Sequence, residues 1–298
     1  MRVHFLNCIS TCPLGGALMD GHGKGLRGRL TCTCLLVEGP SSLILIDTGF
    51  GLRDVAAPRA RLSPFFLKLL EPEFREEMTA IRQIERLGFH PDDVRDVVLT
   101  HLDFDHAGGL DDFPRARVHL LRAERDHALE QKTWLDRQRF RPEQWSTQPN
   151  WRVHDPGDGE GWYGFRCVRD LEGLPPEILL IPLRGHTFGH AGVAVRTDAR
   201  WLLDAGDAYF YHAEMDLQNP RCTPGLVLYQ TMMEKDRSAR LDNQARLREL
   251  RRAASGEVEI FCSHDVREFE RHAGRSSHDP PERAVTAAPS WSSPGAEA

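Results

Sequence analysis

The chain has 298 residues, of which 40% are hydrophobic and 28% are charged, and its formal net charge is −6 at pH 7. This length and composition predict one globular domain that can bury a sizeable core. The acidic balance and the dispersed Lys and Arg residues argue against a large nucleic-acid-binding surface, so the expected partner is a small molecule.

The first residues and the cysteines predict a cytoplasmic protein. The apolar stretch after Met1 is too short for a secretory signal peptide, and no segment reads as a membrane span. Seven cysteines, an odd number, fit a reducing compartment. The pairs Cys8/Cys12 and Cys32/Cys34 lack the usual Cys-x₂-Cys spacing, so we interpret them as small buried thiols, with structural zinc as the alternative.

Apolar runs bounded by glycine, proline and polar residues predict alternating strands and helices. Strands are expected at residues 2–6, 30–37, 42–46, 96–100, 118–121, 178–183, 201–203 and 258–262. Helices are expected at residues 72–88, 123–131 and 237–254, where apolar residues recur at helical spacing. A glycine-rich loop lies between the first two strands, from residue 15 to residue 28, and is expected to border the active site.

Two further segments have an unusual composition. Residues 132–165 form an aromatic, weakly periodic insertion, which either acts as an apolar lid over a substrate or packs onto the body of the domain. Ser, Pro and Ala dominate residues 275–298, which predicts a disordered tail. The catalytic domain is therefore expected to span residues 1–274.

The most informative segment follows the predicted strand 96–100. It places His101, Asp103, Asp105 and His106 within six residues. Borderline divalent ions accept imidazole nitrogen and carboxylate oxygen, so this loop predicts a metal site. Four more predicted strands end in a polar residue beside a glycine or another small residue. These residues are Asp47, His186, Asp207 and His264. Each has an alternative role as a turn residue, a helix cap or a buried imidazole, but together they predict convergence on one cleft.

This ordered set of motifs resembles the metallo-β-lactamase-fold hydrolases, specifically the lactonase and glyoxalase II-like branch. Their pattern is an early Asp, a His-x-His-x-Asp-His loop, a downstream His, an Asp after a strand and a final His. The resemblance implies an α/β fold, a four-layer αββα sandwich, with two divalent ions for which zinc is the expected metal. The ligands it implies are His101, Asp103 and His186 for the first ion, Asp105, His106 and His264 for the second, and Asp207 as the bridge.

The resemblance also implies supporting and catalytic roles. Asp47 and His190 would support the ligands, and Asp105 would also help to move a proton to the leaving group. In lactonase-like members a tyrosine just beyond the bridging Asp assists the substrate carbonyl, and Tyr209 or Tyr211 is the corresponding candidate.

The implied reaction is attack of a metal-bound hydroxide on an ester or lactone of a small substrate, with thioesters, amides and phosphoesters as further candidates. Asp103 departs from the family pattern because it stands where a histidine is usual. A carboxylate there makes the first site harder, which leaves iron or manganese as alternatives to zinc. It also leaves open a di-iron oxidoreductase of flavodiiron type that needs a separate electron donor. A non-catalytic metal-binding module is the third alternative.

Overall fold

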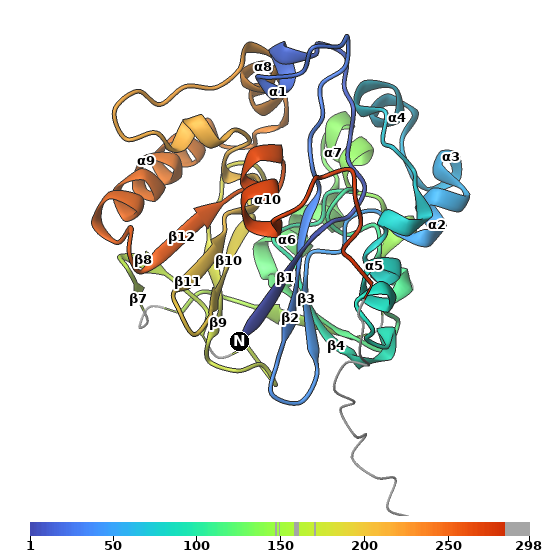
Figure 1. Ribbon diagram of the computed structural model, residues 1–298, viewed down its shortest axis with the longest axis vertical. Coiled ribbons are helices and arrows are strands. Elements are labelled where there is room, and N and C mark those ends of the chain that lie inside the picture. The colour runs from blue at the N-terminus through green and yellow to red at the C-terminus, as the bar shows by residue number, and fades with distance from the viewer. Residues whose placement is uncertain (147, 149, 158–160, 170, 284–298) are drawn as a thin grey trace, which may run out of the picture.

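Two β-sheets face each other, and helices cover their outer sides (Figure 1). The computed structural model describes residues 1–283 except 147, 149, 158–160 and 170. The larger sheet has six strands in the order of the chain. They are β1 (Arg2–Asn7), β2 (Thr33–Glu38), β3 (Leu43–Ile46), β4 (Val94–Val98), β5 (Arg117–Leu121) and β6 (Trp151–His154). β1, β2 and β3 are antiparallel neighbours, whereas β3 to β6 run parallel, so the chain leaves β3 and β4 at the same edge.

The smaller sheet has the strand order β12-β11-β10-β9. Its strands are β9 (Ile178–Pro182), β10 (Ala191–Arg196), β11 (Trp201–Asp204) and β12 (Val258–Phe261). β11 and β12 are parallel, and the other neighbours are antiparallel. A separate short hairpin is formed by β7 (Gly161–Trp162) and β8 (Phe165–Arg166).

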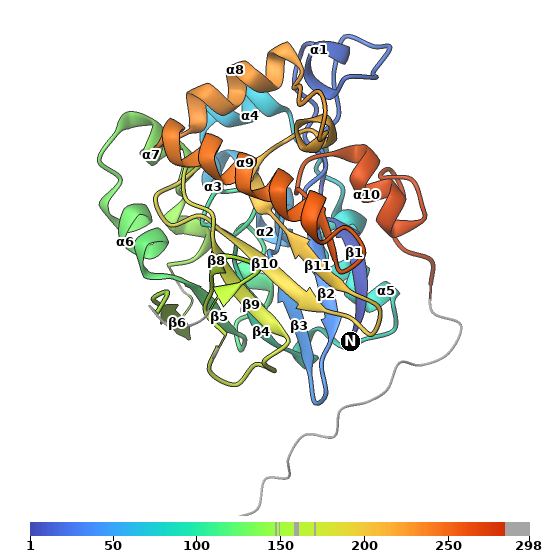
Figure 2. The same cartoon turned by 90° about the vertical axis from the view of Figure 1, so that its left-hand side faces the viewer.

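The helices are short except for α9. The α-helices are α1 (Ala17–Asp20), α2 (Leu52–Ala56), α3 (Pro58–Arg61), α4 (Pro64–Leu70), α5 (Ala80–Arg86), α6 (Arg122–Glu130), α7 (Trp134–Arg139), α8 (Pro224–Met233), α9 (Arg237–Ala253) and α10 (Val266–Ala273). The 3₁₀ turns are η1 (Glu76–Met78), η2 (Pro91–Asp93), η3 (Leu110–Asp112), η4 (Pro142–Gln144), η5 (Gly206–Ala208) and η6 (His212–Met215). In both cartoon views α1 and α8 lie side by side at one end of the molecule (Figures 1 and 2).

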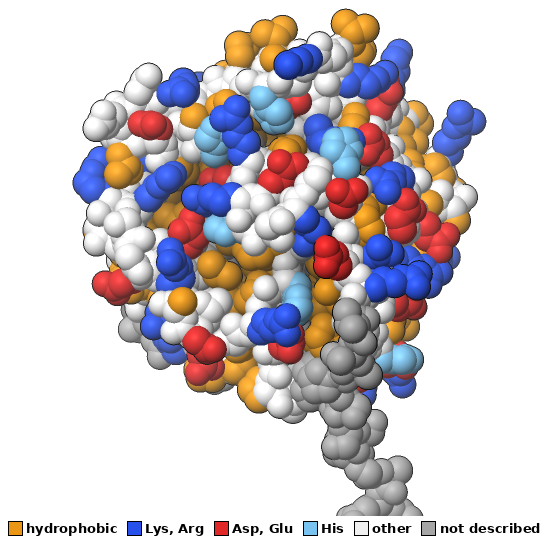
Figure 3. Space-filling view, in the orientation of Figure 1, with side chains coloured by type: hydrophobic (Ala, Val, Ile, Leu, Met, Phe, Trp, Pro, Cys, Tyr) orange, Lys and Arg blue, Asp and Glu red, His pale blue; other side chains and the backbone are white. Residues whose placement is uncertain are grey.

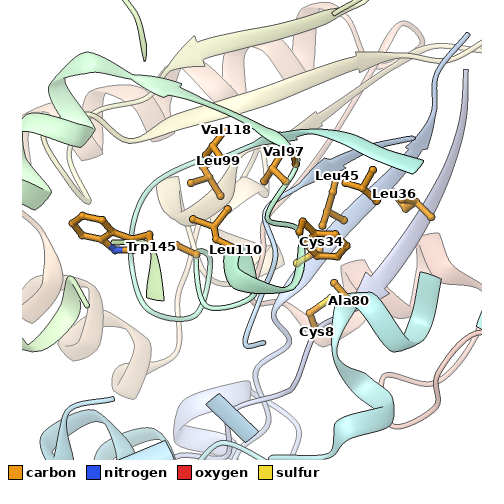
Figure 4. Close-up of a cluster of buried hydrophobic side chains, with 14 of the residues drawn as sticks. Cys8, Cys34, Leu36, Leu45, Ala80, Val97, Leu99, Leu110, Val118 and Trp145 are labelled. Atoms are coloured by element: carbon orange, nitrogen blue, oxygen red, sulfur yellow. The ribbon is translucent and has the colours of Figure 1, made fainter. Parts of the chain in front are cut away.

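The predicted αββα sandwich is confirmed by three layers of apolar packing. Between the sheets, Leu35 and Ile46 of the larger sheet pack with Leu180 and Val193 of the smaller one. On the outer face of the larger sheet, α5 closes a second cluster, shown in Figure 4. On the outer face of the smaller sheet, α9 contributes Leu247 and Leu250 to a third cluster. Each fully buried large apolar side chain stabilises the fold by about 1.5–3 kcal/mol.

Aromatic side chains of the segment 132–165 pack in the apolar clusters on the outer faces of both sheets. Trp145 lies in the cluster on the outer face of the larger sheet, where Figure 4 shows it beside Leu110. Trp162 lies in the cluster under α9, and Trp151 begins β6, the edge strand of the larger sheet. Trp134 on α7 is exposed. Several of these aromatic side chains thus pack onto the body of the domain.

Two predicted helices differ from the structure in their details. The helix expected at 72–88 begins only at Ala80, after the turn η1. Phe74 packs edge-on against Phe50, with ring centroids 5.5 Å apart, so it faces a different cluster from Ile81. A single straight helix could not serve both clusters. α9 matches the predicted helix 237–254, but Leu241, one of the apolar residues at helical spacing, is 44% exposed and does not enter the core.

The predicted tail starts with residues that contact the body. Asn7 Nδ2 donates to the Ser277 carbonyl at 2.7 Å, and Arg275 Nη2 donates to the Phe5 carbonyl at 2.6 Å. These bonds tie the segment to β1. Residues 284–298 of the predicted tail lie outside the described residues.

The surface shows charges of both signs interspersed (Figure 3). Large apolar side chains are exposed at the end of the molecule formed by α1 and α8, among them Leu18 and Leu228. Among the described helices, none combines the length and the apolar character that crossing a bilayer requires.

Candidate metal centre

Five segments that follow β-strands deliver the predicted ligands to one place. Asp47 follows β3, and the loop His101–His106 follows β4. His186 follows β9, Asp207 lies in η5 after β11, and His264 follows β12. All of these charged and imidazole side chains are buried. The structure therefore brings together all seven residues predicted as metal ligands.

The first group consists of His101, Asp103, His186 and one oxygen of Asp207. Asp103 Oδ2 lies 3.3 Å from His101 Nε2 and 3.0 Å from His186 Nε2. Asp207 Oδ2 lies 3.7 Å from His101 Nε2 and 3.3 Å from His186 Nε2. Four donor atoms thus surround one point.

The second group uses the other oxygen of Asp207. Asp207 Oδ1 lies 3.4 Å from His106 Nε2 and 3.1 Å from His264 Nε2, and these two nitrogens are 3.4 Å apart. Asp105 Oδ2 lies 3.8 Å from His264 Nε2. Asp207 Oδ2 also lies 3.3 Å from His264 Nε2. The carboxylate of Asp207 therefore lies between the two groups, which is the position that a bridging carboxylate requires.

These separations fit metal ions. A tetrahedral site with ligand bonds of ~2.0–2.1 Å has edges of about 3.3–3.4 Å, close to the distances within both groups. His101 Nε2 is buried and has no hydrogen-bond partner among the described residues. Burial, followed by the neighbouring His106, holds the pKa of His101 well below its usual value, so the ring is neutral and offers a lone pair.

Neighbouring groups orient the imidazoles. The Nδ1 atom of His106 contacts Asp47 Oδ2 at 2.7 Å, and His264 Nδ1 contacts the Thr31 carbonyl at 2.6 Å. His101 Nδ1 contacts Thr100 Oγ1 at 2.9 Å. Since the Nδ1 atoms of these three residues are engaged on the outer side, their Nε2 atoms are directed toward the carboxylates of the centre. His186 Nδ1 has no such partner among the described residues.

Asp47 is placed as its predicted supporting role requires. Its φ is +53°, in the left-handed region that only a few non-glycine residues, Asp among them, tolerate. In this conformation Oδ1 accepts from the Thr100 N–H at 2.8 Å while Oδ2 accepts from Thr100 Oγ1 at 2.7 Å. Asp47 thus joins the end of β3 to the start of the ligand loop.

His190 supports Asp207 through the backbone. Its Nε2 accepts from the Asp207 N–H at 2.8 Å, and its Nδ1 contacts the Leu183 carbonyl at 2.9 Å. Burial, followed by His186, lowers the pKa of His190 to about 3. A neutral His190 is therefore a fixed acceptor that sets the direction of the bridging residue.

Asp103 has a partner that sequence reasoning missed. The guanidinium of Arg139, at the end of α7, donates to both oxygens of Asp103, with distances of 2.6 and 2.5 Å. Burial raises the pKa of Asp103, but Arg139 and then His101 outweigh it and hold the pKa well below its usual range. Arg139 belongs to the charged segment Asp136–Arg139, whose pattern is typical of a solvent-exposed helix face. The only sequence signal for such a partner was Asp103 itself, a carboxylate at a position where the family usually has a neutral histidine.

Glu124 was also missed, because α6 reads as an ordinary surface helix. Its carboxylate accepts from the Leu102 N–H at 2.9 Å and from the Thr187 hydroxyl, so it joins the two ligand loops. Burial raises its pKa to about 7. A Cβ at Gly189 would lie 1.9 Å from the Glu124 nitrogen, so only glycine permits this close approach of α6 and the His186 loop.

The two predicted tyrosines have different surroundings, and Tyr211 packs against the cluster that contains Phe210 and Tyr229. Tyr209 is buried and its hydroxyl donates to Glu268 at 3.0 Å, which argues against a role at the substrate. The hydroxyl of Tyr211 lies where a side chain at Gly21 would stand, in the α1 region. A different phenol, Tyr229 on α8, is close to the centre: burial and then Asp105 and the other two carboxylates raise its pKa well above the usual value. Its position twenty-two residues beyond Asp207 gave no sequence signal.

Cys32 lies closer to the centre than its interpretation as a core thiol suggested. Its sulfur is within 4.8 Å of ligand atoms of Asp105 and His264. It precedes β2 and packs in a different cluster from Cys34. Burial raises its pKa to about 12, so in the metal-free protein it is a thiol.

An apolar cavity of about 630 Å³ lies among α1, α4 and α8. Residues from three segments line it, and they include Gly15 of the glycine-rich loop, Leu70 and Tyr229. Tyr229 forms part of its wall and contacts Phe210, with ring centroids 5.6 Å apart. Phe210 in turn stacks on His264 at 5.0 Å. These aromatic rings connect the cavity to the predicted second metal site.

Fold and site together define a member of the metallo-β-lactamase superfamily. Residues 27–256 match the sequence profile of that superfamily, and the chain belongs to it. It is 39% identical over 265 residues to a protein of Mycobacterium tuberculosis (strain ATCC 25618 / H37Rv) named "probable metallo-hydrolase", with 89% of this chain and 80% of the relative covered. It is 27% identical over 192 residues to N-acyl homoserine lactonase AiiA of Bacillus thuringiensis subsp. kurstaki, with 62% and 69% covered.

Solved structures show the same fold. An N-acyl homoserine lactone hydrolase with the product N-hexanoyl-L-homoserine at its catalytic metal centre superposes with a TM-score of 0.66 at 22% identity, over 90% of this chain and 95% of that one. The dizinc quorum-quenching lactonase AidC gives 0.56 at 17% identity, over 89% of each chain. The predicted family, fold and metal-dependent hydrolase class are confirmed. The family implies divalent metal ions, and the His/Asp groups are the site that fits them.

Proposed function

We propose that the chain hydrolyses lactones or small esters that carry an apolar group. The observation that carries this proposal is the apolar cavity, whose wall residue Tyr229 is connected to His264 of the second group through the ring of Phe210. A substrate with its apolar group in the cavity would present its ester bond at the centre. Relatives named N-acyl homoserine lactonases support this substrate class.

The residues around the proposed reaction have separate roles. One ion would be held by His101, His186 and Asp103. The other ion would be held by His106 and His264, and Asp207 would bind both ions. Bound divalent ions would supply a readily ionised water and a Lewis acid for the ester carbonyl.

Asp105 is suited to carry a proton. Burial raises its pKa above the usual value, against the effect of His106 and His264, and the carboxyl group lies at the edge of the second group. A carboxylate in this position can take up a proton and pass it to the departing alkoxide. Tyr229, whose pKa is raised, keeps its hydroxyl proton and can donate a hydrogen bond to the substrate carbonyl.

The oxidoreductase alternative rests on Asp103 making the first site more negative. Arg139 offsets that charge through two hydrogen bonds, which weakens the argument from charge for an iron-selective site, although the donor atom remains a carboxylate oxygen. Zinc therefore remains the expected metal.

Turnover with a panel of substrates tests the proposal. Protein loaded with Zn²⁺ or Mn²⁺ is assayed on N-acyl homoserine lactones of increasing chain length, simple lactones, thioesters and phosphodiesters. We expect lactone hydrolysis whose kcat/KM increases with the length of the apolar group. Asp207→Ala should lose both turnover and metal, whereas Asp198→Ala, a change of an exposed carboxylate, should retain both. Absence of lactone and ester turnover by fully loaded wild-type protein would overturn the proposal.

A further inference from the structure

Arg139 is a fully buried cation beside the first group of ligands, with 0% of its surface exposed. Its Nε donates to Asp103 Oδ1 at 2.6 Å and its Nη2 to Asp103 Oδ2 at 2.5 Å. The remaining nitrogen, Nη1, donates to the Met233 carbonyl at the end of α8 at 2.7 Å. Both oxygens of Asp103 are therefore engaged by the guanidinium.

The same guanidinium contacts a second ligand atom. Arg139 Nη2 lies 2.7 Å from His186 Nε2, the nitrogen that faces Asp207 Oδ2 at 3.3 Å. A metal ion in the first group needs the lone pair of this nitrogen and an oxygen of Asp103. Arg139 uses both as hydrogen-bond acceptors.

Arg139 is held firmly in this position. α7 begins with a capping box in which Thr133 Oγ1 accepts from the Asp136 N–H at 3.1 Å and Asp136 accepts from the Thr133 N–H at 2.9 Å. Lys235 forms an ion pair with Asp136. At the other end of α7, the Arg139 carbonyl accepts from the Phe104 N–H at 3.2 Å, within the ligand loop. The backbone therefore keeps the guanidinium next to the centre.

The two groups differ in their surroundings. Asp103 and Arg139 together have no net charge, and in this respect the pair resembles the neutral imidazole that the family usually has at this position. Unlike an imidazole, the pair places the guanidinium cation of Arg139 close to the first ion. In the second group the neighbours of His106 Nε2 and His264 Nε2 are each other and the carboxylates Asp207 and Asp105. Coulomb repulsion by Arg139 acts mainly on the first site.

We propose that Arg139 is a positioning residue that makes the two metal sites unequal. It neutralises Asp103 and competes with the ion for Asp103 and for His186 Nε2, so the second site fills first and more tightly. This inference rests on the proposed metal centre and does not depend on the identity of the substrate.

Titration of the metal-free protein with Co²⁺ tests the inference without an activity assay. Metal content after gel filtration and the visible Co²⁺ spectrum report each binding step, with a chromophoric chelator as competitor. Wild-type protein should bind in two steps of clearly different affinity. Arg139→Met should tighten the weaker step by at least about tenfold, because the competing cation is gone, and bring the two steps together.

Arg117→Met is the matched control. Arg117, in the larger sheet, donates to both oxygens of Asp96 from Nε and Nη2, at 2.7 and 2.8 Å. The Arg117→Met variant should be less stable than the wild type but should show the same two metal-binding steps. A second variant, Asp103→His, should weaken the first step, because it leaves Arg139 unpaired beside the ion; adding Arg139→Met to it should restore tight binding.

The outcomes separate the two proposals. Two equal steps in wild-type protein, or a weaker step that Arg139→Met leaves unchanged or weakens, would overturn the inference while leaving the metal centre in place. If Arg139→Met does not fold, tighter first-site binding by Asp103→His alone would overturn it. A folded wild-type protein that binds no Co²⁺ would overturn the metal centre itself.

Discussion

Tyr209 and Tyr229 are both buried phenols, and their hydroxyl groups have different surroundings. Tyr209 donates to Glu268 within the core under α9. Tyr229 lines the apolar cavity, and Phe210 connects its ring to that of His264 in the metal centre. A phenol beside developing negative charge on a carbonyl oxygen stabilises the transition state more than the ground state. Tyr229 is therefore the phenol expected to affect turnover.

We predict that Tyr229→Phe lowers kcat for a lactone roughly 10–100-fold while KM changes little, since one donor to the carbonyl oxygen is lost. Steady-state kinetics of the zinc-loaded variant measure this. Tyr209→Phe is the control: it should retain kcat and lose some stability. Equal losses of kcat in the two variants would contradict the assignment.

The ligands could be read from the sequence because each follows a strand, and strand ends are recognisable. Arg139, Glu124 and Tyr229 could not. They stand on helices whose local pattern is that of a charged surface or an apolar face, and their contacts with the centre arise only when those helices pack. The local sequence pattern of a helix does not show which distant residues it will contact after packing.

α7 is a short helix whose amino-terminal cap contributes to the placement of Arg139. Six residues are too few for a helix that is stable alone, so the cap and the ion pair to Lys235 matter. Thr133→Ala should lower the free energy of unfolding by about 1 kcal/mol, and Thr133→Ser should restore most of it. Urea denaturation of both variants measures the difference. A loss as large in the serine variant would show that the hydroxyl is not the cause.

The boundaries of elements were harder to predict than their existence. The apolar spacing in residues 72–88 is helical, but it spans η1 and α5, whose apolar side chains enter two clusters. Leu241 matches the helical period of α9, yet it lies on the exposed side. The register of a helix face against its sheet depends on packing, so periodicity alone does not define the edges of the buried face.

One buried carboxyl group, that of Glu268, has a higher pKa in the folded protein than in the unfolded chain. Burial, followed by Asp265, raises the pKa of Glu268 from 4.5 to about 8. The folded state therefore binds more protons than the unfolded state between these two values, and this contribution to stability falls as pH rises, by at most ~1.4 kcal/mol per pH unit. Buried His127 and half-buried His272, with pKa values lowered to about 4, act in the opposite direction, but only below pH ~6.5, the usual histidine value.

We predict that the free energy of unfolding of wild-type protein falls between about pH 6.5 and pH 8.5, where these histidines are neutral in both states. Glu268→Gln should make this decline less steep, because an amide does not titrate, while Glu124 and Asp204, whose pKa values are raised to about 7 and about 8, still contribute to it. Urea titrations at several pH values within the range measure both slopes. Parallel slopes for the two proteins would show that Glu268 is not the group responsible.

The metal centre draws its ligands from both sheets. The loop after β4 belongs to the larger sheet, whereas His186, Asp207 and His264 follow strands of the smaller one. Ions held by these residues would join two halves of the molecule that otherwise meet through apolar side chains. Folding and loading are then thermodynamically linked, so the denaturant concentration at which the protein unfolds should depend on how much free zinc the buffer contains.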